Sequence, residues 1–308
     1  MYWVRYAMLT VSVFFLVYVA LSVLLGAAWQ GLKKLRLFES ATALFTLRIL
    51  PMAGSLLVVF LVTIPSFWSL EPSTTDEGIS LPAALLFAAG AAWVTSRGLR
   101  IFSSFKQADK FFAVASPSMQ WRQAAPQFAA YEFPSDAPNM FIAGLWRPRL
   151  MISRAAVELL DAQEMQAAIR HEIAHADSSD NIKQLMVRFC AFPFLTSLDQ
   201  EWLRAAEIDA DERATWDEAG AADLASALIK VGMASPRVAV PELGMSLVPE
   251  ADAPVSARVQ RLLDWKRNSH RGGRAAQLCL LLFPAGMVAF NLVWLMTQMH
   301  RFTEILFQ

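Results

Sequence analysis

The sequence predicts a polytopic α-helical membrane protein with four spans and an α+β domain inserted between the third and the fourth span. Hydrophobic residues make up 56% of its 308 residues, more than an ordinary soluble protein contains. Long apolar runs fill much of residues 1–96 and return in residues 275–308. Between them, residues 97–274 have the mixed charge, prolines and helical periods of a folded domain outside the membrane.

Four apolar runs are the candidate spans. The first, second and fourth have the length that a spanning helix needs, whereas the third is short enough to be a re-entrant or core segment instead. A cleaved signal peptide is the alternative for the first run. The basic residues Lys33, Lys34 and Arg36 directly after it resist translocation and favour a permanent span. The predicted spans are residues 7–29, 49–68, 79–95 and 275–299.

The distribution of charge predicts on which side of the membrane the inserted domain lies. Basic residues gather after the first run, after the third and before the last, while residues 69–80 contain acidic residues but no Lys or Arg. If residues 79–95 cross the membrane, all three basic regions fall on the cytoplasmic side, as the positive-inside tendency requires. We therefore expect a multi-pass protein of the bacterial inner membrane with a cytoplasmic domain.

Composition also limits the partners. Lys plus Arg and Asp plus Glu both number 27, so the net charge gives no reason to expect a direct nucleic-acid partner. The lipid bilayer is an expected partner, and a homo-oligomer is an open option. The two cysteines, Cys190 and Cys279, lack metal-ligand spacing. We expect both to be buried as small hydrophobes, which suits a reducing compartment.

The chemistry is concentrated in a His-Glu-x-x-His motif at residues 171–175. An acidic N-cap at Asp161 with Glu164 three residues later predicts a capping box, and hence a helix through the motif. On a helix His171 and His175 lie one above the other and can place two imidazoles on one Zn²⁺. Glu172 projects beside the open metal position, where it can take a proton from bound water. A chance match on a surface helix is the alternative, made improbable by the presence of only four histidines.

A catalytic zinc needs a third protein ligand, and Glu207 is the best candidate. A metzincin pattern would require a histidine at Asn181, and His270 and His300 lie far along the chain. Glu207 and Asp211 share a face of a predicted helix, so we expect Glu207 to bind zinc and Asp211 to orient a ligand histidine. The alternative for either carboxylate is a solvated helix face, because other acidic residues crowd this segment.

A family resemblance extends this interpretation over roughly residues 138–265. The segment 207–211 resembles the Glu-x-x-Ala-Asp element of gluzincin membrane peptidases. Residues 140–153, the Asp180-Asn181 pair and residues 256–263 resemble the BlaR/MecR-type beta-lactam sensor-transducer family. We expect a form of that family without its C-terminal penicillin-binding domain. The heat-shock and CAAX-prenyl type of membrane protease shares the zinc ligands and an Asn-x-Phe segment similar to residues 139–141.

The resemblance implies a gluzincin-like fold in which a strand beside the zinc helix binds an extended substrate by strand addition. The residues expected in that role are Asn139, Phe141, Ala143 and Gly144. The alternative is that Phe141 and Ile142 are core side chains.

The sequence also predicts a hairpin formed by residues 139–143 and 149–153. Residues 111–115 and 128–133 are further candidate strands.

Taken together, the sequence predicts a membrane-embedded zinc metalloendopeptidase, with Glu172 as general base and Tyr131 and Arg213 as open candidates for stabilising the oxyanion. By resemblance, we expect a regulatory enzyme that cleaves a cytoplasmic protein such as a transcriptional repressor, or its own chain. One alternative is a heat-shock or CAAX-type protease for quality control of membrane proteins. A non-proteolytic scaffold with a structural zinc is the third possibility.

Overall fold

A computed structural model describes residues 2–35, 38–70, 80–145, 147–234, 244–246, 255–265 and 301 of the chain. The chain forms two compact units. The first comprises Met1–Leu99, Cys190–Leu198 and Gly272–Gln308, and the second comprises Arg100–Phe189 and Asp199–Arg271. Residues 190–198 therefore group with the N-terminal helices, although their neighbours on both sides in sequence belong to the second unit.

The first unit is helical. Two of its helical stretches, Trp3–Leu32 and Ala41–Trp68, are long and apolar enough to cross a membrane, and they contain the first two predicted spans. The third predicted span lies in a longer helix that does not meet the same criterion among the described residues, so this crossing stays a prediction. The fourth lies outside the described residues. The helices are α1 (Tyr2–Leu32), η1 (Lys33–Leu35), α2 (Ala41–Val58), η2 (Val59–Thr63), α3 (Ile64–Leu70) and α4 (Leu81–Val114).

Polar side chains within this unit hold the segment 190–198. Arg48, fully buried in α2, donates from Nη2 to the carbonyl oxygen of Cys190 at 2.7 Å, and the Tyr18 hydroxyl donates to the same oxygen. Arg97 donates to the carbonyl of Ala191 at 3.1 Å. Carbonyls at a helix end have no partner within the helix, and these side chains supply one. Cys190 is buried, as the sequence predicted.

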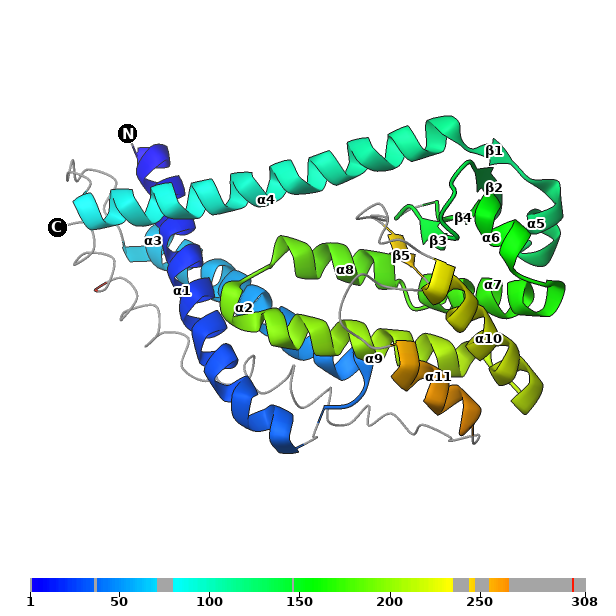
Figure 1. Ribbon diagram of the computed structural model, residues 1–308. Coiled ribbons are helices and arrows are strands. Elements are labelled where there is room, and N and C mark those ends of the chain that lie inside the picture. The colour runs from blue at the N-terminus through cyan, green and yellow to red at the C-terminus, as the bar shows by residue number, and fades with distance from the viewer. Residues whose placement is uncertain are drawn as a thin grey trace. The chain divides into compact units, whose positions relative to one another are not determined.

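The second unit contains a five-stranded sheet of order β1-β2-β4-β3-β5 (Figure 1). Strands β2 and β4 are parallel, and the other pairs are antiparallel. The predicted hairpin is confirmed as β3 and β4, with Gly144 at φ 104° in the turn, a conformation that favours glycine. The strands are β1 (Ser116–Pro117), β2 (Ala129–Phe133), β3 (Met140–Ala143), β4 (Arg149–Ser153) and β5 (Gly244–Ser246).

One of the two other strand predictions is confirmed and one is wrong. Strand β2 occupies almost all of residues 128–133, but residues 111–114 are the end of α4. The run at 111–115 has no apolar–polar alternation and no helix-breaking residue before Pro117, so the helix continues through it.

Helices complete the second unit and enclose its core. The apolar face of α7 packs with side chains of β3, β4 and α10 in one cluster that includes Ile142, Ile169 and Leu228. On the side of α7 that faces this cluster, Met165, Ala168, Ile169 and Glu172 are buried and Ala176 is partly buried. The helices are α5 (Met119–Ala124), α6 (Arg154–Leu159), α7 (Ala162–Asp177), α8 (Asp180–Phe189), η3 (Pro193–Leu195, in the first unit), α9 (Thr196–Ala214), α10 (Glu218–Ala234) and α11 (Val255–Leu263).

The predicted capping box at the start of α7 is confirmed. The Asp161 carboxylate accepts hydrogen bonds from the backbone N–H groups of Gln163 and Glu164, and the Glu164 carboxylate accepts from the N–H of Asp161. Glu164 also accepts hydrogen bonds from Ser226 and Lys230 of α10. The cap therefore fixes both the first turn of α7 and its contact with α10.

We expect Asp161→Ala to lower the free energy of unfolding by about 1 kcal/mol, because it removes the acceptor of two otherwise unpaired backbone donors. Thermal or urea unfolding of the detergent-solubilised chain measures the change. Asp177→Ala, at the exposed C-terminal end of the same helix, is the matched control. A carboxylate there opposes the helix dipole, so the control should be neutral or slightly stabilising. Equal destabilisation by both substitutions would contradict the role of the cap.

Candidate metal centre

Three side chains from two helices converge in the interior of the second unit. His171 and His175 lie one turn apart on α7, with their Nε2 atoms 3.2 Å apart. Glu207 of α9 places Oε2 3.5 Å from Nε2 of His171 and Oε1 3.6 Å from Nε2 of His175. Ligand atoms about 2.0–2.2 Å from a tetrahedral zinc would lie roughly 3.3–3.6 Å from one another. The spacing of these three groups therefore fits one zinc ion.

Each histidine is held by a carboxylate on its other ring nitrogen. Oδ1 of Asp211 lies 3.0 Å from Nδ1 of His171, and Oδ2 of Asp180 lies 2.9 Å from Nδ1 of His175. These contacts favour a proton on Nδ1, which leaves Nε2 free to bind a metal. The structure thus brings Asp211 to His171, and the role of Asp211 in orienting a zinc ligand stays a prediction. Asp180 supports the second histidine, a role that the sequence analysis did not assign.

The position of Asp180 depends on the turn between α7 and α8. Ser179 has a φ of 56°, in the left-handed region that few residues other than glycine adopt. This residue ends α7 and redirects the chain, so that Asp180 begins α8 beside His175. Lys183, one turn further along α8, contacts the other Asp180 oxygen at 3.0 Å. Asp180 follows His175 by five residues, a separation at which side chains on a regular helix are not neighbours. Helical periodicity alone therefore could not predict the contact between Asp180 and His175.

A cation that the sequence analysis did not assign lies beside Glu207 and Asp211. Arg258 of α11 is only 4% exposed. Its Nε and Nη2 donate to Oδ2 and Oδ1 of Asp211 at 2.8 and 2.6 Å, and its Nη1 lies 2.8 Å from Oε2 of Glu207. Burial opposes ionisation of both carboxyl groups, but Arg258 and the neighbouring histidines together outweigh it and lower the pKa of each.

Glu172 is fully buried next to the two histidines and is tied to strand β3. Its Oε2 accepts a hydrogen bond from the backbone N–H of Ile142 at 3.3 Å, and Asn181 donates to the carbonyl of the same residue at 2.8 Å. Burial raises the pKa of Glu172 to about 7. A carboxyl group with such a pKa can both accept and release a proton near neutral pH.

The residues predicted to bind substrate lie on or beside β3. Phe141 and Ala143 are buried on one face of the strand with Phe133 and Met151, while Ile142 faces the core against α7. The side chains of Phe141 and Ile142 are thus core residues, as the alternative interpretation held. Asn139 is anchored to Ser153 of β4 through its backbone N–H and carbonyl. Gly144 ends the strand.

Strand β3 is not an edge strand in the structure, which corrects the expectation that its free edge accepts substrate. Strand β5 pairs antiparallel with β3, with Phe141 opposite Ser246 and Ala143 opposite Gly244. Four prolines between residues 233 and 254 disfavour regular structure, so the sequence gives no sign of this strand. A peptide could pair with β3 along this edge only if β5 moved, so the assignment of residues 139–144 to substrate binding stays a prediction.

Neither open candidate for the oxyanion stabiliser contacts the three converging side chains in the described contacts. Tyr131 lies on β2, which β4 separates from β3, and it packs against the apolar cluster formed by Phe133, Phe141, Ala143 and Met151. Arg213, in the last turn of α9, donates to the hydroxyl of Ser178.

The charges around the centre fit a divalent cation. Four carboxylates gather around the two histidines, and the neighbouring cations are Arg258 and Lys183. If both histidines are neutral and Glu172 is ionised, these described residues carry two more negative than positive charges, which Zn²⁺ would balance. The four carboxylates are Glu172, Asp180, Glu207 and Asp211.

Two imidazoles on one helix, a carboxylate from a later helix and a buried glutamate beside them are the groups that a zinc peptidase uses. Comparison with known proteins agrees with this chemistry. Residues 113–236 match Peptidase family M48. This segment holds every residue discussed above for the centre except Arg258.

The chain is also similar to a known protease homolog. The chain is 25% identical over 165 residues to a protein named Protease HtpX homolog from Chlorobium phaeobacteroides, a match that covers 47% of this chain. The match spans about half, 55%, of that relative's length. M48 peptidases depend on zinc, so zinc is the cofactor that the converging His-His-Glu group fits. The comparisons thus show a likeness to Peptidase family M48 over residues 113–236, whereas the finer resemblance to the beta-lactam sensor-transducer family stays a prediction.

We expect Glu207→Gln to weaken zinc binding by more than about tenfold, because an amide is a poorer zinc ligand than a carboxylate. Asp209→Ala and Glu212→Ala remove carboxylates from the same helix α9 without touching the converging group. Zinc content after dialysis of the three purified variants is the measurement. Equal content in all three would show that Glu207 is not a ligand.

Zinc binding should release protons. Burial alone would lower the pKa of His175, but Glu207 and Asp180 outweigh it and raise this pKa to about 10 in the metal-free site. His175 is therefore protonated at pH 7 and must lose its proton to bind zinc. We expect the apparent zinc affinity to rise with pH between 6 and 8, by about tenfold per unit for each proton released. Chelator competition at several pH values measures this, and a pH-independent affinity would contradict it.

Proposed function

We propose that this chain is a membrane-integrated zinc metalloendopeptidase whose centre cleaves peptide bonds of protein substrates on the cytoplasmic side. The observation that carries the proposal is the position of Glu172. It is completely buried beside His171 and His175, and a backbone N–H of β3 holds one of its carboxylate oxygens. A structural metal site has no need for a buried, unligated carboxylate at this place, whereas hydrolysis needs a base there.

The described residues divide the chemistry among them. Zinc, when bound, would lower the pKa of a water molecule and polarise the scissile carbonyl. Glu172 takes a proton from the attacking water and later gives it to the leaving amine, which its pKa of about 7 allows. Asp211 and Asp180 keep the Nε2 atoms of His171 and His175 directed at the centre. The N–H of Ile142 fixes Glu172 relative to β3.

Two substrate classes remain in competition. The match to a Protease HtpX homolog favours a heat-shock type of protease that clears membrane proteins with broad specificity. The resemblance of residues 140–153 and 256–263 to sensor-transducer peptidases favours a regulatory enzyme that makes a defined cut in one cytoplasmic protein, such as a repressor, or in its own chain. Either enzyme needs a protein substrate and a lipid bilayer as partners. A homo-oligomer stays a prediction.

A scaffold with a structural zinc is the weaker alternative. Structural zinc sites are usually closed by four protein ligands. Among the described residues, the group that could hold a metal has three members, which leaves one position for water or substrate.

We expect Glu172→Gln to keep zinc and to lower the rate of proteolysis by about 10²–10⁴-fold, because it removes the base and no ligand. New protein N-termini in cells carrying the wild type or the variant are the measurement. Glu158→Gln makes the same change on the exposed surface of α6 and is the control. Near wild-type cleavage by the Glu172 variant would refute the proposal.

The same experiment separates the two substrate classes. A single cut in one partner would identify a regulatory enzyme. Cuts in many unfolded or membrane proteins would identify the heat-shock type.

A further inference from the structure

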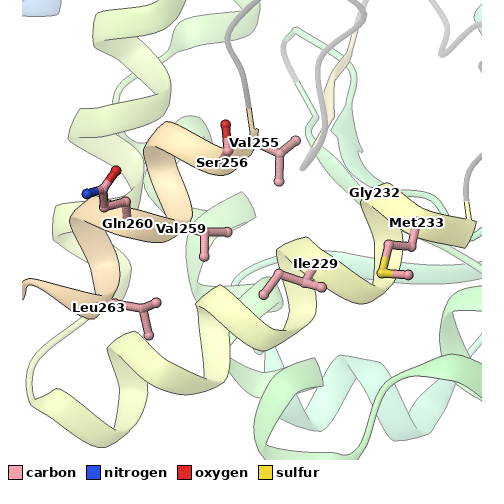
Figure 2. Close-up of a pocket in the computed structure, with 8 residues that line it drawn as sticks. All are labelled: Ile229, Gly232, Met233, Val255, Ser256, Val259, Gln260 and Leu263. Atoms are coloured by element: carbon pink, nitrogen blue, oxygen red, sulfur yellow. The ribbon is translucent and has the colours of Figure 1, made fainter.

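Helix α11 contributes one side chain to the metal centre from outside the segment that matches the peptidase family. The match ends at residue 236, and α11 begins at Val255. Arg258 and Leu262 lie one turn apart on the buried face of α11, and each is 4% exposed. The neighbouring face lines a groove with α10, where Val255, Val259 and Leu263 face Ile229 and Met233 (Figure 2). Leu262, with Val255 and Val259, also packs in the apolar cluster that includes Leu228 of α10, and this packing holds the helix that presents Arg258.

The guanidinium group of Arg258 joins two carboxylates with different roles. Nε and Nη2 engage both oxygens of Asp211, whose Oδ1 also lies 3.0 Å from Nδ1 of His171. Nη1 lies 2.8 Å from Oε2 of Glu207. Glu207 and Asp211 are one turn apart on α9, where two like charges repel each other. A planar guanidinium can hold two carboxylates in fixed directions, which a point charge cannot.

We infer that Arg258 is a positioning residue of the metal centre, which orients the Glu207 carboxylate directly and the His171 imidazole through Asp211. The inference rests on the proposed zinc centre. It assigns to α11 the task of arranging two of the three metal-binding groups before zinc arrives. The centre is therefore incomplete without a helix that follows the proline-rich stretch between residues 233 and 254.

A purely stabilising role explains this arrangement less well. Buried ion pairs are weak contributors to stability, because the loss of hydration offsets much of the attraction between the charges. A cation beside a ligand carboxylate also opposes zinc binding by simple electrostatics. If orientation dominates, removing Arg258 lowers the zinc affinity. If electrostatic repulsion dominates, removing Arg258 raises it. We expect orientation to dominate, because three nitrogen atoms of one side chain each contact a carboxylate oxygen.

The test compares Arg258→Met and Arg258→Lys with Arg261→Met in the full-length, detergent-solubilised chain. Arg261 lies on the same helix and pairs with Glu212 at the surface, so it is a matched arginine–glutamate control. We expect Arg258→Met to weaken zinc binding about 10–100-fold in competition with a chromophoric chelator. The Lys variant should recover part of this loss, and the Arg261 variant should bind zinc like the wild type.

A spectroscopic readout separates positioning from general stability. Cobalt in place of zinc reports ligand geometry through its visible absorption bands, so Arg258→Met should change these bands while Arg261→Met should not. In a Glu207→Gln background, the loss of affinity caused by Arg258→Met should shrink, because one of the two oriented groups is already absent.

Wild-type affinity and an unchanged cobalt spectrum in folded Arg258→Met protein would overturn the inference. If that variant does not fold, the same two measurements on Arg258→Lys decide, and wild-type values there would overturn it. A wild-type chain that binds no zinc would instead refute the proposed function.

Discussion

The structure of the second unit depends on the burial of negative charge around two histidines. Glu172, Glu207, Asp180 and Asp211 are all at most 3% exposed. An isolated buried carboxylate is strongly unfavourable, so each one needs a cation, a hydrogen-bond donor or a proton. Arg258 pairs with Glu207 and Asp211, and Lys183 pairs with Asp180. Glu172 accepts a hydrogen bond from a backbone N–H of β3, and its raised pKa favours the protonated form. The charge that remains is what a divalent metal would neutralise.

This constraint explains why the centre is assembled from elements far apart in sequence. Helix α7 supplies the two imidazoles and Glu172, and α9 supplies the two carboxylates that face α7. Strand β3 contributes no side chain to the converging group, but its backbone at Ile142 contacts both Glu172 and Asn181. The strand therefore fixes the position of the base relative to the sheet. Helix α11 closes the arrangement with Arg258.

The parts of the site that could be predicted from sequence are those set by helical periodicity. The spacing of four places His175 over His171 and Asp211 over Glu207, and the cap at Asp161 fixes where α7 begins. Asp180 could not be predicted from spacing, because a left-handed residue at Ser179 interrupts the helix before it. Arg258 and strand β5 were missed because their contacts join residues that are distant in sequence, with prolines between them. The strand predicted at 111–115 was wrong because an alanine-rich run without alternation extends a helix as readily as it forms a strand.

The path of the chain shows why the centre is not a self-contained segment. After α8 the chain passes through residues 190–198, which group with the N-terminal helices, before α9 brings Glu207 to the histidines. Arg48 and Tyr18, both in predicted spans or close to them, bind the carbonyl of Cys190 in this segment. A fragment limited to residues 97–274 would retain all four carboxylates and both histidines but would lose these two partners. The link between α8, which holds Asp180, and α9, which holds Glu207, would then lack the hydrogen bonds that Arg48 and Tyr18 provide.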